Sequence, residues 1–201
     1  MKILVYTITY NRLNLTREYL RSLKEHTHIK FDHIIFDNGS TDRTVEYLRA
    51  FNYKVISFGE NLGITEAQNR GLRTIYKDYD FIIKFDNDCE VVSDFILEKI
   101  LNFYDCEEKN KYILSPIDLA LDPLYKPQVL GYEGNIELTT HNGGMFRVVP
   151  NIAMDYMITK DIRMDVNEGR VWRDGGFKVG YFKDLEVIHR GLNLGSSDYK
   201  L

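Results

Sequence analysis

Residues 81–88 read FIIKFDND, and this stretch decides the fold. A mostly apolar run of strand length is followed at once by two carboxylates and an amide. A continuous apolar run bounded by turn residues is typical of a strand that is buried on both faces, as in a parallel sheet. The stretch therefore predicts an inner strand whose carboxyl end carries Asp86, Asn87 and Asp88.

Three apolar runs upstream have the same form. They predict strands over residues 2–9, 31–36 and 54–58. Apolar residues at helical spacing predict helices that start after the caps Asn11 or Asn14, start at Ser40, and cover residues 64–76 and 94–104. Strand and helix thus alternate four times over residues 1–104. This alternation favours an α/β fold with a mainly parallel central sheet, right-handed crossovers and helices on both faces.

Residues 105–201 have a different pattern, with several strands and few helices between them. Strands are expected over 112–114, 136–140, 145–149, 177–182 and 185–189. The change near residues 104–112 is one of pattern, with no linker composition around it. We therefore expect a single domain over 1–201, with a smaller and more β-rich second half.

Composition limits the function classes. A length of 201 residues suits one domain, and 44% hydrophobic with 28% charged residues is ordinary for a globular protein. The formal net charge of −4 lacks the basic excess expected of a nucleic-acid binder. Cys89 and Cys106 are too few for a disulfide framework or a four-thiolate zinc site.

The sequence also predicts a location. The apolar run at residues 3–6 is too short for a signal peptide, and no stretch approaches the roughly 20 apolar residues that span a bilayer. We expect a cytoplasmic protein. Peripheral contact with a membrane remains open, because it needs no span.

Polar residues follow each of the four predicted strands, at the end where ligands bind in open α/β sheets. They are Thr7 and residues 9–12 after the first strand, residues 37–42 after the second, Asn61 and Gly63 after the third, and residues 86–88 after the fourth. The convergence of four strand ends on one edge is the main indication of a site.

Asp86 and Asp88 stand at i and i+2 after the fourth strand, about 6.6 Å apart along the chain and on the same side. Such a pair suits a divalent cation such as Mg²⁺, which takes one or two carboxylates and completes its shell with water and substrate phosphates. The alternative is a solvated acidic turn that caps the next helix.

Residues 37–42, which read DNGSTD, form a turn and a helix cap on the simplest interpretation. That interpretation leaves unexplained why Asp37 comes directly after an apolar strand. A carboxylate at this edge can accept hydrogen bonds from a nucleobase N–H or a ribose hydroxyl, and we favour this role for Asp37.

Four segments together resemble family 2 glycosyltransferases of the GT-A fold. They are residues 7–12 (TITYNR), 37–44 (DNGSTDRT), the pair N-x-G at 61–63 and 69–71, and the D-x-D at 86–88. The resemblance covers about residues 1–90. It implies a Rossmann-like three-layer sandwich, with a nucleotide-sugar-binding half over 1–104 and an acceptor-side half over 105–201. Gln68 departs from the family pattern, which often has Arg there.

The resemblance also implies the chemistry and the roles of residues. It implies an inverting transferase that uses a nucleoside-diphosphate sugar and Mn²⁺ or Mg²⁺. Thr7, Tyr10 and Asp37 would hold the base, Asp86 would face the ribose and Asp88 the metal. Arg12, Asn61 and Gly63 complete the expected donor site, and Asp86 is also a candidate metal ligand.

The second half matches the family through Gly176-Phe177 and the closing strand that ends in His189. Counting backwards places Asp165 on the family's general base, with Met164 where the family has Glu. His189 would be the third metal ligand. Asp155 and Asp161 compete as acids, and His141 competes as the ligand.

A glycosyltransferase that moves sugar to a glycan or another hydroxyl acceptor is therefore the favoured function. A nucleotidyltransferase is disfavoured, because no glycine follows the first strand. A catalytically inactive module that binds sugar nucleotides or glycans remains open. The two can be told apart by turnover, since a module releases no nucleoside diphosphate.

Overall fold

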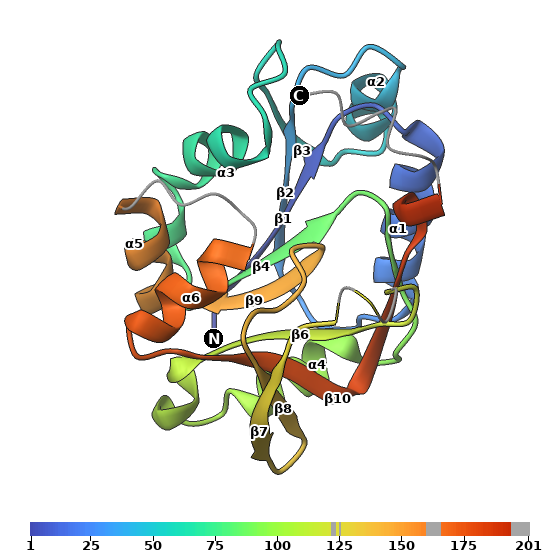
Figure 1. The fold of residues 1–201 in the computed structure, drawn as a ribbon. Coiled ribbons are helices and arrows are strands. Elements are labelled where there is room, and N and C mark those ends of the chain that lie inside the picture. Colours follow the sequence, from blue (N-terminus) through green and yellow to red (C-terminus); the bar gives the residue numbers. More distant parts are fainter. Residues whose placement is uncertain (122–123, 125, 160–165, 194–201) are drawn as a thin grey trace.

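The computed structural model describes residues 1–121, 124, 126–159 and 166–193, and Figure 1 shows their arrangement. The strands of this part are β1 (Ile3–Thr9), β2 (Asp32–Asp37), β3 (Lys54–Ser57), β4 (Phe81–Asp86), β5 (Cys89–Val91), β6 (Tyr112–Asp118), β7 (Val129–Glu133), β8 (Ile136–Thr139), β9 (Phe146–Pro150) and β10 (Lys178–His189). The helices are α1 (Leu13–Glu25), α2 (Thr44–Ala50), α3 (Ile64–Leu72), α4 (Ile96–Phe103), α5 (Asn151–Thr159) and α6 (Val166–Asp174). Short 3₁₀ turns cover Tyr76–Asp78, Glu107–Lys111 and Arg190–Asn193.

The strands of the described part form one sheet in the order β3-β2-β1-β4-β9-β6-β10-β8-β7, and β5 pairs with β10. β1, β2, β3 and β4 are parallel. β9 runs antiparallel to both β4 and β6, so β6 points the same way as β4, and β10 is parallel to β6. The carboxyl ends of β1, β4, β6 and β10 therefore share one edge of the sheet.

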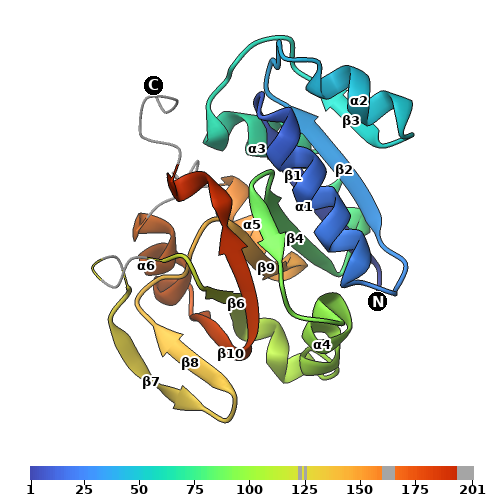
Figure 2. The ribbon, with the colours of Figure 1, turned by 90° about the vertical axis from the view of Figure 1, so that its right-hand side faces the viewer.

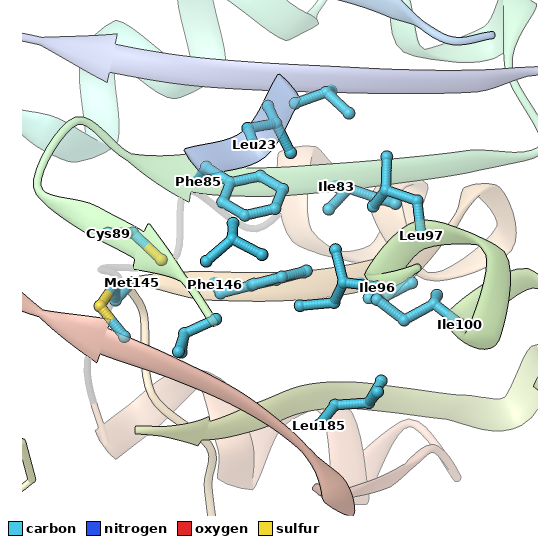
Figure 3. Packing of buried hydrophobic residues seen from close by; sticks show 14 of the residues in the cluster. Leu23, Ile83, Phe85, Cys89, Ile96, Leu97, Ile100, Met145, Phe146 and Leu185 are labelled. Atoms are coloured by element: carbon cyan, nitrogen blue, oxygen red, sulfur yellow. The ribbon is translucent and has the colours of Figure 1, made fainter. Parts of the chain in front are cut away.

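Helices cover both faces of the sheet. In β1 the consecutive residues Leu4 and Val5 point to opposite faces of the sheet, and both are fully buried. On one face, strand side chains pack against α1, α2 and α4, and Figure 3 shows the centre of this cluster around Phe85 and Phe146. On the other face they pack against α3, α5 and α6. Figure 1 shows α3, α5 and α6 on one side of the sheet and α1 on the other, and Figure 2 looks onto the α1 face.

The helix α1 illustrates how the sequence determines this packing. Thr16, Tyr19, Leu20 and Leu23 are buried and recur at i, i+3, i+4 and i+7, so they form one stripe against the sheet. The same side chains enter the core cluster with Phe85.

The predicted caps of the first two helices are wrong. The residues that precede α1 and α2 are Arg12 and Arg43, and both have left-handed backbone conformations without a side-chain cap. The carboxylate of Asp42 serves both helices instead. One of its oxygens accepts from the Leu13 N–H at 2.9 Å and the other from the Thr44 N–H at 3.2 Å. The starts of α1 and α2 are thereby joined.

The second half differs from its prediction in three ways. α5 and α6 were not expected there, the two last strands are one long strand β10 with an irregularity between Phe182 and Glu186, and the hairpin strand β7 was missed. The short strand β5 was missed in the first half. In the described part of the chain, no helix is long and apolar enough to cross a membrane.

Candidate active site

The strand order reverses next to β1, because β2 and β3 lie on one side of it and β4 on the other. Ligands of open α/β sheets bind at such a switch point, outside the carboxyl ends of the strands. Ile8 pairs with Asp86 across β1 and β4, so the polar residues that follow both strands meet there.

Asp88 lies at the centre of this edge. Its side chain is only 3% exposed, and its two oxygens face different cationic groups. Oδ2 accepts a hydrogen bond from Arg12 Nη1 at 2.7 Å, and Oδ1 lies 3.3 Å from Nε2 of His189. The predicted residues Arg12, Asp88 and His189 are therefore brought together, from β1, β4 and β10.

The pairing of β5 with β10 explains how His189 reaches Asp88. His189 pairs with Cys89, the residue directly after Asp88, and the Arg190 N–H donates to the Asp88 carbonyl at 2.9 Å. The His189 N–H donates to the carboxylate of Asp118 at 3.0 Å. Asp118 ends β6 at the same edge, and sequence reasoning missed it because the signal at Asp118 was a single acid in a proline-containing segment.

The charges around Asp88 set its ionisation. Burial alone would raise the pKa of its carboxyl, but the adjacent imidazole of His189 and the charge of Arg12 outweigh burial and hold the pKa below its usual range. Burial lowers the pKa of His189, and Asp88 more than reverses this, so the imidazole pKa is raised. The pair is thus an ionised carboxylate beside a readily protonated imidazole.

Asp86 has a separate partner. Its Oδ1 accepts from Nζ of Lys84 at 2.5 Å, and the same ammonium donates to the Gly144 carbonyl at 2.5 Å. Lys84 is a buried cation within a central strand, with its side chain 4% exposed. Sequence reasoning passed over it, although a single charge inside an apolar strand was a usable signal.

Asn87 holds the loop after β1 against the end of β4. Its Nδ2 lies 3.1 Å from the hydroxyl of Thr9, 3.1 Å from that of Thr16 and 3.2 Å from the Asn11 carbonyl. The middle residue of the D-x-D is therefore a structural clamp that positions the chain around Arg12.

Among the predicted base contacts, only Tyr10 presents a large exposed surface. Its side chain stands at the edge with 42% of the residue exposed. Thr7 is fully buried, and its hydroxyl lies 2.7 Å from the Tyr19 hydroxyl beneath α1. The structure does not bring Thr7 to the edge, because its strand position points to the α1 face of the sheet.

Asp37 is 1% exposed and already has partners. It accepts from the Ser40 N–H at 3.1 Å and from the Ser57 hydroxyl at 2.7 Å. Gly39 follows in a left-handed conformation, and a Cβ there would lie 2.7 Å from the backbone of Glu60. The Ser40 contact is the one that the turn interpretation expects, and the Ser57 contact ties Asp37 to β3.

Asn61 and Gly63 form the next turn along this edge. Asn61 Oδ1 accepts from the amide of Asn38 at 2.8 Å and from the Gly63 N–H at 2.9 Å. Gln68, which replaces the Arg of the family pattern, is buried and accepts from the Tyr6 hydroxyl at 2.7 Å.

Asp165 lies outside the described residues, and so does Asp161. His141, the competing ligand, hydrogen-bonds the Thr140 hydroxyl through Nδ1 at 3.2 Å, away from the contacts of Asp88.

The donor set at Asp88 fits a divalent cation in part. His189 Nε2 is buried without a hydrogen-bond partner of good geometry and faces a carboxylate oxygen, which suits two ligands of a shared ion. Within the described ranges, no three acidic, histidine or cysteine side chains cluster closely enough to hold a metal. Asp86 is turned to Lys84, so the structure does not assemble the predicted set of Asp86, Asp88 and His189. Two protein ligands still suffice where a diphosphate and water supply the others.

The family pattern of Glycosyl transferase family 2 matches residues 4–161. The chain belongs to this family. A comparison with curated protein sequences gives no match.

Several solved structures have a similar fold. S. aureus TarS 1-349 is 19% identical and matches 95% of this chain and 61% of its own, with a TM-score of 0.69. Mannosyltransferase PcManGT from Pyrobaculum calidifontis, in complex with GDP-Man and Mn²⁺, is 15% identical over 96% of this chain and 58% of its own, with a TM-score of 0.74. GalNAc-T7 with UDP, GalNAc and Mn²⁺ is 13% identical over 98% of this chain and 46% of its own, with a TM-score of 0.70. The chain thus spans about three fifths of the first two structures. The expected α/β GT-A fold with a mostly parallel central sheet is confirmed.

Proposed function

We propose that this chain is a metal-dependent glycosyltransferase that moves a sugar from a nucleoside-diphosphate sugar to a hydroxyl acceptor with inversion. The observation that carries the proposal is the buried group of Arg12, Asp88 and His189 at the switch point of a family 2 fold. Solved structures of this fold contain UDP-GlcNAc or GDP-Man, and two contain Mn²⁺. Residues 1–104 would bind the donor, and residues 105–201 would face the acceptor.

Asp88 and His189 are the residues that would hold the divalent cation, Mn²⁺ or Mg²⁺. When bound, the cation would act as a Lewis acid on the leaving diphosphate. Tyr10 offers an exposed ring on which a nucleobase can stack. Lys84 holds one oxygen of Asp86, and the other oxygen would accept a hydrogen bond from a ribose hydroxyl of the donor.

An acceptor hydroxyl is a weak nucleophile, so a carboxylate must take its proton as the new bond forms. We keep Asp165 as the proposed base. A base on the face of the sugar opposite the leaving group gives inversion, as in paired-carboxylate glycosidases. The loss of a general base typically costs 10²–10⁴-fold in rate, so Asp165→Asn should lower kcat by roughly that factor and leave the donor KM within a few-fold.

The test is a panel of nucleotide sugars, including UDP-GlcNAc and GDP-mannose, incubated with Mn²⁺ or Mg²⁺ and scored for release of nucleoside diphosphate. Slow hydrolysis of one donor by the wild type, and none by Asp88→Asn, is the expected result. If a nucleotide sugar binds in calorimetry but no variant and no acceptor ever gives release, the chain is a binding module and the proposed activity is wrong.

A further inference from the structure

Arg12 has an unusual place beside Asp88. It is the residue before α1 and has a left-handed conformation with φ 65°. Hydrogen bonds fix the backbone on both sides of it. The Asn11 N–H donates to the Ser40 hydroxyl at 2.8 Å, and the Thr16 N–H donates to the Arg12 carbonyl at 3.0 Å. The backbone therefore holds the side chain over the D-x-D.

The contact with Asp88 is close and shielded. Nη1 lies 2.7 Å from Oδ2, and the exposed fractions of the two side chains are 17% and 3%. In such surroundings an ionised carboxylate needs a compensating cation, because burying an unpaired charge is costly. Arg12 supplies that cation.

There is little room for a second cation on the same oxygen. Gly191 packs over the pair, so closely that a Cβ at this position would lie 2.0 Å from Asp88 Oδ2 and 3.0 Å from Arg12 Nη1. Gly191 belongs to the 3₁₀ turn Arg190–Asn193, which Figure 1 shows in red beside α1. Oδ2 is thus enclosed by Arg12 and Gly191, so an ion at Asp88 would either use Oδ1, which faces His189, or move the guanidinium.

The neighbouring carboxylate shows the contrast. The cation of Asp86 is Lys84, which stems from the middle of β4, is almost fully buried and also donates to the Gly144 carbonyl. Arg12 reaches Asp88 from a loop at the edge of the sheet and is more exposed. Of the two cations, Arg12 is the one whose side chain does not come from a strand of the sheet.

We propose that Arg12 is a built-in counter-cation of Asp88 that opposes the binding of a divalent metal, because the guanidinium already neutralises the carboxylate that the metal would use. This inference rests on the proposed function, since it assumes that Asp88 is the metal ligand. The proposal predicts that removal of the Arg12 side chain strengthens the binding of the metal in the absence of nucleotide.

The test measures Mn²⁺ binding without nucleotide, by the electron paramagnetic resonance signal of free Mn²⁺ at fixed pH 7.5. Arg12→Asn is the main variant, because Asn tolerates the left-handed conformation and carries no charge. A charge-assisted hydrogen bond contributes about 1.5–3 kcal/mol, so its removal should tighten Mn²⁺ binding about 10- to 100-fold. Arg12→Lys keeps the charge and should bind Mn²⁺ like the wild type.

Arg43→Asn is a matched control. Arg43 also precedes a helix, with φ 71°, but its side chain is 81% exposed and its partner Glu46 lies outside the site. It should leave Mn²⁺ affinity unchanged, and Asp88→Asn combined with Arg12→Asn should abolish the gain. Equal or weaker Mn²⁺ binding by folded Arg12→Asn overturns the proposal, as does the absence of Mn²⁺ binding in every variant. This assay uses no sugar donor. If the chain fails to transfer sugar, the proposed function is wrong, but the measured Mn²⁺ affinities still test the role of Arg12.

Discussion

The clamp made by Asn87 allows a quantitative prediction about the site. Asn87 is 7% exposed and joins the end of β4 to Thr9, Asn11 and Thr16, of which the two threonines are fully buried. Its amide has two N–H groups for three acceptors within 3.2 Å. Truncation to alanine therefore removes two hydrogen bonds and leaves buried acceptors without a donor.

The size of the effect follows from these contacts. Each net hydrogen bond contributes about 1 kcal/mol, and an unsatisfied buried group costs about 1–3 kcal/mol. We expect Asn87→Ala to lower the free energy of unfolding by about 2–4 kcal/mol, which for a chain of this size is roughly 4–16 °C in Tm. Asn87→Asp keeps the volume but removes both donors, so it should destabilise the protein at least as much.

Urea denaturation followed by circular dichroism measures the change, with an unchanged m-value as the sign that only stability moved. Asn14→Ala is the control, because Asn14 is exposed on α1 and should stay within about 0.5 kcal/mol of the wild type. A loss below 1 kcal/mol for Asn87→Ala would refute the reasoning, since it would mean that the amide does not hold the two strand ends together.

Three further predictions concern other parts of the molecule. Gly180→Ala should lower the free energy of unfolding by about 2–3 kcal/mol in urea titration, because its Cβ would lie 2.2 Å from the Glu137 carbonyl oxygen. Gly131→Ala is the control and should be near neutral, because a Cβ there has no atom within 4 Å. Asp37→Ala should cost about 1–3 kcal/mol by the same measurement, because it strands the Ser40 N–H and the Ser57 hydroxyl; an unchanged stability would contradict the turn interpretation. Burial lowers the pKa of His33 to about 4, whereas its value in the unfolded chain is about 6.5. Between these pH values the unfolded chain binds a proton that the folded protein does not, so stability falls as the pH drops from 6.5 towards 4. The loss should be about 1–3 kcal/mol for this partly exposed residue and should be absent in His33→Gln.

The sequence predicted the first half of the fold well because its signals are local. Each buried strand of residues 1–104 is a continuous apolar run, and each helix has its own apolar stripe. β5 was missed because its three residues are held by β10, about a hundred residues later in the chain. α5 was missed because Ile152, Ala153 and Met154 follow a proline-ended strand and give no helical spacing that can be distinguished from a loop.

The candidate site shows the same division. The position of Asp88 at a strand end could be predicted from an apolar run followed by a turn. The inward direction of Thr7 could not, because β1 is buried on both faces and its sequence shows no polar–apolar alternation from which to tell the two faces apart. The partners of the acids were also hidden, since Arg12 lies 76 residues from Asp88 in the chain and only the pairing of parallel strands brings them together.

The two acids of the D-x-D are alike in sequence and differ in the structure through their cations. Lys84 shares a strand with Asp86, so that pair forms with the strand itself and stays closed as long as β4 exists. Arg12 and His189 approach Asp88 from two other strand ends, so the partners of this carboxylate are assembled only in the folded protein and do not belong to its own strand. A charge that must change partner during a reaction cycle is better placed on Asp88 than on Asp86. These contacts favour a fixed, positioning role for the first acid, and they support our proposal that the second acid binds the cation.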